Sequence, residues 1–208
     1  MADPQTLGVV LAGGLARRMS GDDKARIRVG GLTILERIVR RLRPQCRSVI
    51  VNANVDPAAF ADTGLPVVAD SVPGHPGPLA GILAGLDWAA SQARTIEWIA
   101  SVPSDAPFLP GDLVVRLHRA RADASASLVC ASSGGRRHPT VALWPVALRE
   151  DLRHALTNEG VRRVSEWAAR YDLVVAEWPA VPIDPFFNVN TPEQAAEAQS
   201  LAALHPEA

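Results

Sequence analysis

A glycine-rich segment follows the first apolar run of the chain. Leu7–Leu11 reads as a buried strand and continues directly into Ala12, Gly13 and Gly14. At the carboxyl end of a first strand, glycines let backbone N–H groups converge on an anion, and open α/β sheets bind phosphate there. Two familiar versions are excluded. No Lys-Ser or Lys-Thr pair follows the glycines as in a P-loop, and no G-x-G-x-x-G occurs in the chain.

Cations accompany these glycines. Arg17 and Arg18 follow Gly14, and Lys24 lies ten residues after it. Lys24 is the only lysine among 21 basic residues, and lysine differs from arginine in offering a compact point charge on a flexible stem. Three cations beside free N–H groups suit a triphosphate, whose charge must be neutralised before a nucleophile can reach phosphorus. The alternative is an ordinary βα connection with solvated arginines.

Two carboxylates and an amide follow later predicted strands. Asp105 comes after the apolar run Ile96–Val102, where it can reach a magnesium ion that bridges nucleotide phosphates. Mg²⁺ prefers one or two carboxylates plus phosphate and water oxygens, so a second protein ligand is not required. Asp70 is placed similarly, and Asn52 can offer its amide to a base or ribose. The alternative for both carboxylates is helix capping or turn formation.

Further polar and charged candidate residues lie later in the chain. Asn188 and Asn190 are two apart, so in an extended segment both side chains project from one face and can bind phosphate or magnesium-bound water. The alternative is an Asx turn before the next helix. His138 precedes a proline and is ordinarily a loop residue, and the pair Arg162 and Arg163 can equally be solvated surface.

Short apolar runs alternate with longer helical patterns along the whole chain, which is the pattern of an α/β fold. Most of the predicted strands are continuously apolar, as parallel strands covered on both faces should be. We find no linker or repeat that divides the chain, and predict a single domain. The expected strands are Leu7–Leu11, Ser48–Val51, Pro66–Ala69, Ile96–Val102, Ser127–Ala131, Thr140–Leu143 and Asp172–Glu177. The expected helices are Thr33–Leu42, Pro78–Ala93, Pro110–Ala122, Pro145–Ala155, Val161–Arg170 and Pro192–Leu204.

Composition limits the classes of function. The 208 residues are 48% hydrophobic, and 21 basic against 22 acidic side chains give a formal net charge of −1. A protein that coats nucleic acid needs an excess of cations, so nucleic acid is not an expected partner. No apolar run reaches membrane-spanning length and no signal peptide is indicated, so no membrane partner is expected either. Cys46 and Cys130 lie apart without metal-ligand spacing, which favours a cytoplasmic protein.

The segment L-A-G-G-x3-R-M-x4-K at residues 11–24 resembles the signature of the molybdenum cofactor guanylyltransferase family, within the nucleotidyltransferase superfamily. The resemblance extends over nearly the whole chain, and so many ordered elements make accident improbable. It implies a Rossmann-like, three-layer α/β/α nucleotidyltransferase fold with a mostly parallel sheet. The further matching segments are V-N-A-N at 51–54, Asp70, G-P-L-A-G-I at 77–82, P-S-D-A-P at 103–107, H-P-T at 138–140, G-V-R-R-V at 160–164 and F-N-V-N-T-P at 187–192.

The resemblance also implies roles for individual residues. GTP would bind mainly within residues 7–110, and residues 130–195 would contribute most to the acceptor site. The catalytic residues implied are Arg18, Lys24 and Asp105, with Asp105 also holding Mg²⁺. The nucleotide-binding residues implied are Leu11, Ala12, Gly13, Gly14, Lys24, Asn52, Asp70 and Asp105. The acceptor-binding residues implied are His138, Arg162, Arg163, Asn188 and Asn190.

The implied reaction transfers GMP from GTP to the terminal phosphate of molybdopterin, with or without bound molybdenum, and releases pyrophosphate. A phosphate oxygen attacks the α-phosphorus, so no protein nucleophile is needed. In related cytidylyltransferases an alanine displaces one glycine of the first segment, so Gly13 and Gly14 favour GTP over CTP. The alternatives are a CTP-using molybdenum cofactor cytidylyltransferase, a sugar-nucleotide pyrophosphorylase and a non-catalytic GTP-binding regulator. A protein partner that handles so labile a cofactor is compatible with the sequence but leaves no motif in it.

Overall fold

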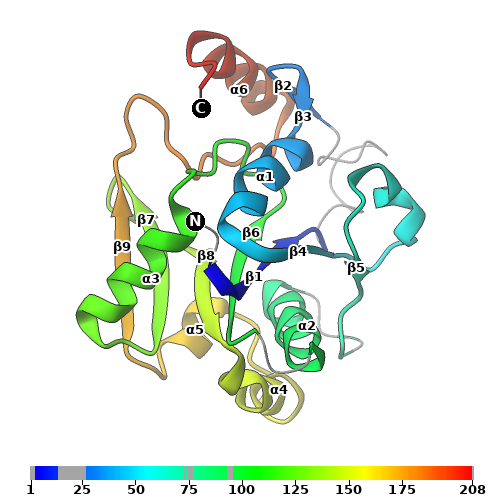
Figure 1. Cartoon of the computed structure of the whole chain (residues 1–208), viewed down its shortest axis with the longest axis vertical. Helices are drawn as coiled ribbons and strands as arrows, with labels where there is room; N and C mark the ends of the chain where they lie inside the picture. The colour runs from blue at the N-terminus through cyan, green and yellow to red at the C-terminus, as the bar shows by residue number, and fades with distance from the viewer. Residues whose placement is uncertain (1–2, 14–26, 73, 75–76, 93–95, 208) are drawn as a thin grey trace.

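The computed structural model describes residues 3–13, 27–72, 74, 77–92 and 96–207. Over these ranges strands and helices alternate, as expected for an α/β fold (Figure 1). The strands are β1 (Asp3–Leu11), β2 (Arg28–Val29), β3 (Leu32–Thr33), β4 (Cys46–Asn52), β5 (Val67–Val68), β6 (Trp98–Pro103), β7 (Leu128–Ser133), β8 (Arg136–Pro145) and β9 (Leu173–Trp178). The α-helices are α1 (Ile34–Leu42), α2 (Pro78–Ser91), α3 (Leu113–Ala124), α4 (Arg149–Thr157), α5 (Val164–Ala168) and α6 (Pro192–Leu204). Short 3-10 helices are η2 (Arg43–Gln45), η3 (Pro57–Thr63) and η4 (Val146–Leu148).

Within the described residues, seven strands form one sheet in the order β5-β4-β1-β6-β8-β7-β9. The neighbours are parallel except that β8 runs antiparallel to both β6 and β7, so the predicted mostly parallel sheet is confirmed. The chain first builds from β1 outward to β4 and β5, then returns to place β6 on the other side of β1. Open α/β sheets bind ligands at such a reversal, outside the carboxyl ends of the strands.

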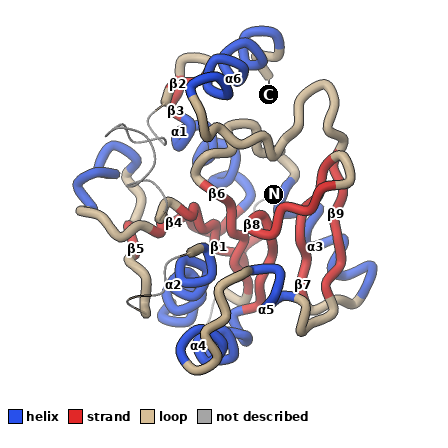
Figure 2. The backbone as a smooth tube through the Cα atoms, turned by 180° about the vertical axis from the view of Figure 1, so that it is seen from behind, coloured by secondary structure: helices blue, strands red, loops and turns tan. Residues whose placement is uncertain are grey.

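Helices cover both faces of this sheet, which confirms the predicted three layers (Figures 1 and 2). Successive residues of a strand point to opposite faces. Leu7 and Val9 of β1 therefore pack on the side of α2, α4 and α5, whereas Val10 packs on the side of α1, α3 and α6. All three side chains are fully buried. The core consequently lies in two layers, and loops at the strand ends are left to form a site.

Each predicted strand and helix is present, with bounds shifted by a few residues. Helix α3 begins at Leu113 rather than at Pro110, because a turn in which Leu113 N donates to Pro110 O (3.3 Å) precedes it. The β2–β3 hairpin was not predicted, since each of its strands has two residues. Its signal was the pair Gly30 and Gly31, which supply the positive φ angles (59° and 84°) that a two-residue hairpin turn requires.

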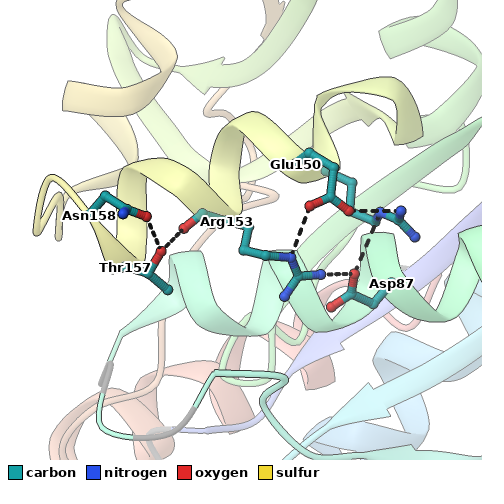
Figure 3. Close-up of polar contacts among 6 residues, drawn as sticks. Asp87, Glu150, Arg153, Thr157 and Asn158 are labelled. Atoms are coloured by element: carbon teal, nitrogen blue, oxygen red, sulfur yellow. Dashed lines mark hydrogen bonds and ion pairs between the residues drawn. The ribbon is translucent and has the colours of Figure 1, made fainter.

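Ion pairs join α2 to α4 on the face away from α1. Figure 3 shows Arg153 between Asp87 of α2 and Glu150 of α4. Arg153 Nη2 lies 2.5 Å from Asp87 Oδ1, and Arg149 Nε lies 3.7 Å from the same oxygen. The Asp87 side chain is only 22% exposed, so this pair is less screened by solvent than an ordinary surface pair. It fixes α4 against the helix that begins at the candidate site.

Cys46 and Cys130 are both buried and free. Among the residues that the structure describes, no helix combines the length and the apolar character needed to span a bilayer.

Candidate active site at the carboxyl edge of the sheet

Strands β4, β1 and β6 are neighbours at the reversal point, and all three end at the same level. Leu11 at the end of β1 is in register with Asn52 of β4 and with Pro103 of β6. Backbone hydrogen bonds continue past the strands, because Ala12 N donates to Asn52 O (2.8 Å) and Ser104 N donates to Leu11 O (3.2 Å). The sheet therefore brings the start of the glycine-rich segment, Asn52 and the loop with Asp105 to one edge, where nucleotide binding was predicted.

Asn52 and Asp70 contact each other at this edge. Asn52 Nδ2 donates to Asp70 Oδ1 (2.9 Å) and to Val68 O (3.1 Å). Asn54 holds the other carboxylate oxygen at 2.6 Å, and its own Oδ1 accepts from Asp70 N (2.8 Å). Asp70 thus orients both asparagines, and the Asn52 side chain is locked with its amide nitrogen already engaged. The Asn52 Oδ1 atom remains on the side of α2 and the glycine-rich segment.

Gly81 of α2 leaves the space that Asn52 occupies. A Cβ at residue 81 would lie 2.2 Å from Asn52 Oδ1 and 2.9 Å from Leu11 Cδ2, both far inside contact distance. A Cβ at Gly13 would lie 3.9 Å from the same Asn52 oxygen. The first turn of α2 and the end of β1 therefore converge on Asn52. A side chain larger than hydrogen at residue 81 would displace that amide.

Asp105 and Asn188 are 83 residues apart in the chain and meet in the structure. Asn188 Nδ2 donates to Asp105 Oδ1 at 2.5 Å, and Val189 N donates to Asp105 O at 2.8 Å. Asp105 lies two residues past β6, beside the reversal point of the sheet. Asp105, which was predicted to bind the nucleotide, and Asn188, which was predicted to bind the acceptor, are therefore in direct contact. Asp105 is the point of contact between the two predicted sets of residues.

The donor chemistry at Asp105 fits a magnesium ion. Its carboxylate is half-buried at the edge where the predicted phosphate loop begins, and an oxygen donor of this kind is what Mg²⁺ selects. The described residues contain no group of three or more His, Cys, Asp or Glu that could hold a metal by themselves. A site with one carboxylate needs phosphate oxygens to complete it, which is the usual arrangement for magnesium nucleotides.

His138 lies at the start of β8 and is 7% exposed. Its Nε2 is 2.8 Å from Ser133 Oγ, and Ser133 Oγ donates to Asp184 Oδ1 at 2.7 Å. The His138 ring packs against Phe186 with 4.8 Å between ring centroids. Burial lowers the pKa of His138 below its usual range, and the nearby Asp184 carboxylate opposes that shift. His138 is therefore neutral at physiological pH.

Of the remaining predicted residues, Arg162, Arg163 and Asn190 lie within the part of the chain that the structure describes. Arg162 and Arg163 are exposed at the start of α5, and the Arg162 carbonyl lies 3.9 Å from the Cβ position of Gly77, the N-cap of α2. Asn190 is exposed, and its backbone N donates to Gln194 Oε1 at 2.7 Å. Gly14, Arg18 and Lys24 fall outside the described residues, as does Arg17.

Sequence reasoning missed Ser133, which contacts His138, and Asp184, which accepts a hydrogen bond from Ser133. The Asp184-Pro185 pair was a turn signal, because aspartate and proline favour the first two positions of a β-turn. Nothing in the sequence connected Ser133 to a residue 51 positions later. That contact depends on β7 and β9 lying side by side.

The reversal point of the sheet, with Asn52, Asp70 and Asp105 at its carboxyl edge, is typical of a nucleotide-binding α/β protein. A family model described as the MobA-like NTP transferase domain matches residues 8–175. The chain belongs to this family.

Curated relatives match over nearly the full length. A Nitrobacter hamburgensis protein named "Molybdenum cofactor guanylyltransferase" is 56% identical over 201 residues, covering 97% of this chain and 96% of its own. A protein of the same name from Rhodopseudomonas palustris strain HaA2 is 54% identical over 208 residues, covering 100% of this chain and 97% of its own.

Solved structures share the fold at low identity. One from Archaeoglobus fulgidus, titled as molybdopterin-guanine dinucleotide biosynthesis protein A, has a TM-score of 0.74 at 19% identity and covers 96% of this chain and 99% of its own. An Anaerococcus prevotii structure titled as 4-diphosphocytidyl-2C-methyl-D-erythritolsynthase has a TM-score of 0.71 at 14% identity, covering 95% and 98%. At these identities the likeness concerns the fold, which was the predicted one.

Proposed function

We propose that this protein is a molybdenum cofactor guanylyltransferase, which transfers GMP from GTP to the terminal phosphate of molybdopterin. The observation that carries the proposal is the agreement in name among curated relatives 54–56% identical over nearly the whole chain. The geometry supports the same conclusion, because the reversal point of the sheet gathers Leu11, Asn52 and Asp105 at one edge. That edge is where an α/β sheet binds a nucleotide.

In the reaction, an oxygen of the acceptor phosphate forms a bond to the α-phosphorus of GTP. The bond from that phosphorus to the α,β-bridging oxygen breaks, and pyrophosphate leaves. The protein's task is to position the reactants and neutralise their charge. Magnesium bound at Asp105 would supply positive charge to the phosphates, and Asn188 orients that carboxylate through its amide.

Further residues are assigned to the substrates by the family signature. Gly14, Arg18 and Lys24 would contact the triphosphate, and the main chain of residues 11–14 would contact the guanine. Asn52 and Asp70 form a rigid pair beside this segment. For the anionic acceptor we propose Arg162, Arg163, Asn188 and Asn190. The buried ring of His138 offers an acceptor little surface.

The first experiment is calorimetric titration of the purified protein with GTP and with CTP, each with magnesium. We expect tight, magnesium-dependent binding of GTP and binding of CTP at least roughly tenfold weaker, because a pocket that pairs with one base discriminates against another. An Asp105→Ala variant should lose the magnesium dependence. Preference for CTP would instead indicate a cytidylyltransferase, and binding of neither nucleotide would contradict the proposal.

Turnover is then measured as pyrophosphate release with GTP and molybdopterin. Lys24→Ala should lower the rate by roughly a hundredfold or more while the melting temperature stays near that of the unaltered protein, since a lost phosphate contact acts on the transition state. Unchanged turnover of this variant would remove Lys24 from the catalytic residues. Tight GTP binding with no pyrophosphate release would favour a GTP-binding regulator.

A further inference from the structure

Residues 184–189 form a segment, here called the strap, that connects the far half of the sheet to Asp105. It follows β9 and precedes α6, and it contacts β7 at one end and the loop after β6 at the other. Between these strands lies β8, so the strap crosses the carboxyl edge of the sheet. Its two ends are fixed by different groups of side chains.

The first end is held by Ser133, His138 and Asp184. A serine hydroxyl has one hydrogen, and Ser133 donates it to Asp184 Oδ1 at 2.7 Å. The 2.8 Å contact between Ser133 Oγ and His138 Nε2 must then be made by an Nε2–H that donates to the hydroxyl. The hydrogen bonds therefore run in one direction, from histidine to serine to aspartate. In this series of hydrogen bonds both the Nε2–H of His138 and the hydroxyl of Ser133 donate, so His138 carries a proton on Nε2.

Aromatic packing reinforces the same end. Phe186 of the strap is 2% exposed and lies between two rings. Its centroid is 4.8 Å from that of His138 and 5.4 Å from that of Trp178, with the Trp178 ring almost perpendicular at 87°. Phe186 N also donates to Asp184 Oδ1 at 2.9 Å. Side chains from β8 and β9 thus set the position of the strap in addition to the hydrogen bonds.

A turn connects the first end of the strap to the second. Phe187 N donates to Asp184 O at 3.1 Å, which closes a turn with Pro185 at its second position. Directly after the turn come Asn188 and Val189, the two residues that donate to the side chain and the backbone of Asp105. Asn188 lies only four positions after Asp184 in the chain. A displacement of Asp184 would therefore move Asn188, because a hydrogen-bonded turn links the two residues.

We propose that Ser133, His138 and Asp184 are positioning residues that hold the strap so that Asn188 stays against the Asp105 carboxylate. The inference rests on the proposed function, in which Asp105 holds the metal of the magnesium nucleotide. It gives His138 an indirect role in the reaction and explains why a histidine near the predicted acceptor region is buried.

The test compares three truncating variants, Ser133→Ala, His138→Leu and Asp184→Ala, with the unaltered protein. Each should lower kcat for pyrophosphate release by roughly tenfold and change the KM for GTP by less than about threefold, because the contacts of the nucleotide with β1 and β4 are untouched. Hydrogen exchange of the Val189 amide, which donates to Asp105 O, should accelerate in each variant. This second readout does not depend on turnover.

A double-mutant cycle separates positioning from general destabilisation. If Asp184 acts through Asn188, Asp184→Ala should lower kcat by about tenfold in the unaltered protein but by less than about twofold in an Asn188→Ala background. A role in stability alone predicts the same factor in both backgrounds, and that result would overturn the inference. Normal Val189 exchange in all three variants would overturn it as well.

Conservative variants provide the rescue. Gln at residue 138 can present an N–H near the position of Nε2, and Asn at residue 184 keeps the accepting oxygen, so His138→Gln and Asp184→Asn should retain kcat within about threefold.

Asp151→Ala is a matched control, because Asp151 of α4 also accepts a side-chain hydrogen bond, from Trp167 Nε1 (2.8 Å), outside the strap. It should leave Val189 exchange unchanged. If the unaltered protein releases no pyrophosphate, the proposed function fails, and Val189 exchange still decides whether these residues hold the strap.

Discussion

Asn52 illustrates how single residues at the sheet edge are held in one orientation. Its amide nitrogen is committed to Asp70 and Val68, and its oxygen faces the space left by Gly81. The side chain is 2% exposed, so a change of rotamer would bury polar groups without partners. A glycine one turn into α2 therefore shapes the proposed nucleotide site even though it offers no functional group.

Gly81→Ala should weaken GTP binding by roughly tenfold and lower the free energy of unfolding by about 1–3 kcal/mol, because its Cβ would displace Asn52 Oδ1. Calorimetric titration with Mg·GTP and urea unfolding measure the two effects. Gly85→Ala is the matched control on the same helix, since its Cβ would meet Val9 Cγ2 at 2.8 Å in the core. We expect a similar loss of stability there with unchanged GTP affinity, and equal affinity losses in both variants would contradict the role of Gly81.

His138 should make stability depend on pH. Its pKa is lowered in the folded protein chiefly by burial, with Arg136 acting in the same direction and Asp184 and Glu177 opposing it. Below the unfolded pKa of about 6.5 the unfolded chain binds a proton that the folded chain resists, so the free energy of unfolding falls as pH falls. This contribution is complete above that pKa and is lost as pH falls through the folded value.

Urea unfolding between about pH 7.5 and about pH 5 tests this, with His138→Gln as the comparison because glutamine does not titrate. The unaltered protein should lose more stability over that interval than the variant does. Parallel curves for the two proteins would mean that His138 does not titrate differently on folding.

At the scale of elements, helix starts and turns place the segments that carry the site. Helix α6 begins with a capping box in which Gln194 N donates to Thr191 Oγ1 (3.3 Å) and Thr191 N donates to Gln194 Oε1 (3.1 Å). The same Gln194 oxygen accepts from Asn190 N. The cap therefore fixes the backbone directly after the strap as well as the first turn of the helix.

Thr191→Ala should lower the free energy of unfolding by about 1 kcal/mol, which in a chain of this length lowers the melting temperature by roughly 2–4 °C. Ser200→Ala is the matched control, because the Ser200 hydroxyl donates to Ala196 O within the same helix and is exposed. That variant should melt within about 1 °C of the unaltered protein. A loss in Ser200→Ala as large as that in Thr191→Ala would show that any hydroxyl of α6 contributes equally.

At the scale of the whole molecule, the strand order decides which loops meet. Strands β4 and β5 lie on one side of β1, and β6, β8, β7 and β9 lie on the other. Asp105, in the loop after β6, lies beside the reversal point. The strap links Asp105 to Ser133 at the end of β7. A magnesium nucleotide bound at this point would contact both halves of the sheet, so binding should stabilise the molecule as a whole.

Magnesium and GTP together, at about a hundredfold excess over the dissociation constant, should stabilise the folded protein by about 2.7 kcal/mol, raising the melting temperature by roughly 5–10 °C. Thermal unfolding followed by circular dichroism measures this. Asp105→Ala should lose most of the shift at the same concentrations, and Asp87→Ala, which breaks the α2–α4 ion pair, should keep it despite a lower starting temperature. A full shift in Asp105→Ala would argue against metal binding at that carboxylate.

Sequence alone determined the family, the order of strands and helices, and the residues at the ends of β1, β4 and β6. These follow from local information, because apolar periodicity gives the elements and parallel strands must end at a shared edge. The pairing of Asn52 with Asp70 and of Asn188 with Asp105 could not be predicted, although all four residues were selected. Each pair depends on which strands become neighbours and on the path of a loop.

Tertiary structure alone decided the role of buried polar residues. A histidine before a proline is ordinarily a loop residue, yet His138 lies in β8, where Ser133 of β7 contacts it and Phe186 of the strap packs on its ring. Similarly, Gly81 is one of several small residues in α2 until the helix is docked on Asn52. Burial and contact arise from segments far apart in the chain, because hydrophobic packing between layers brings them together after the local elements are specified.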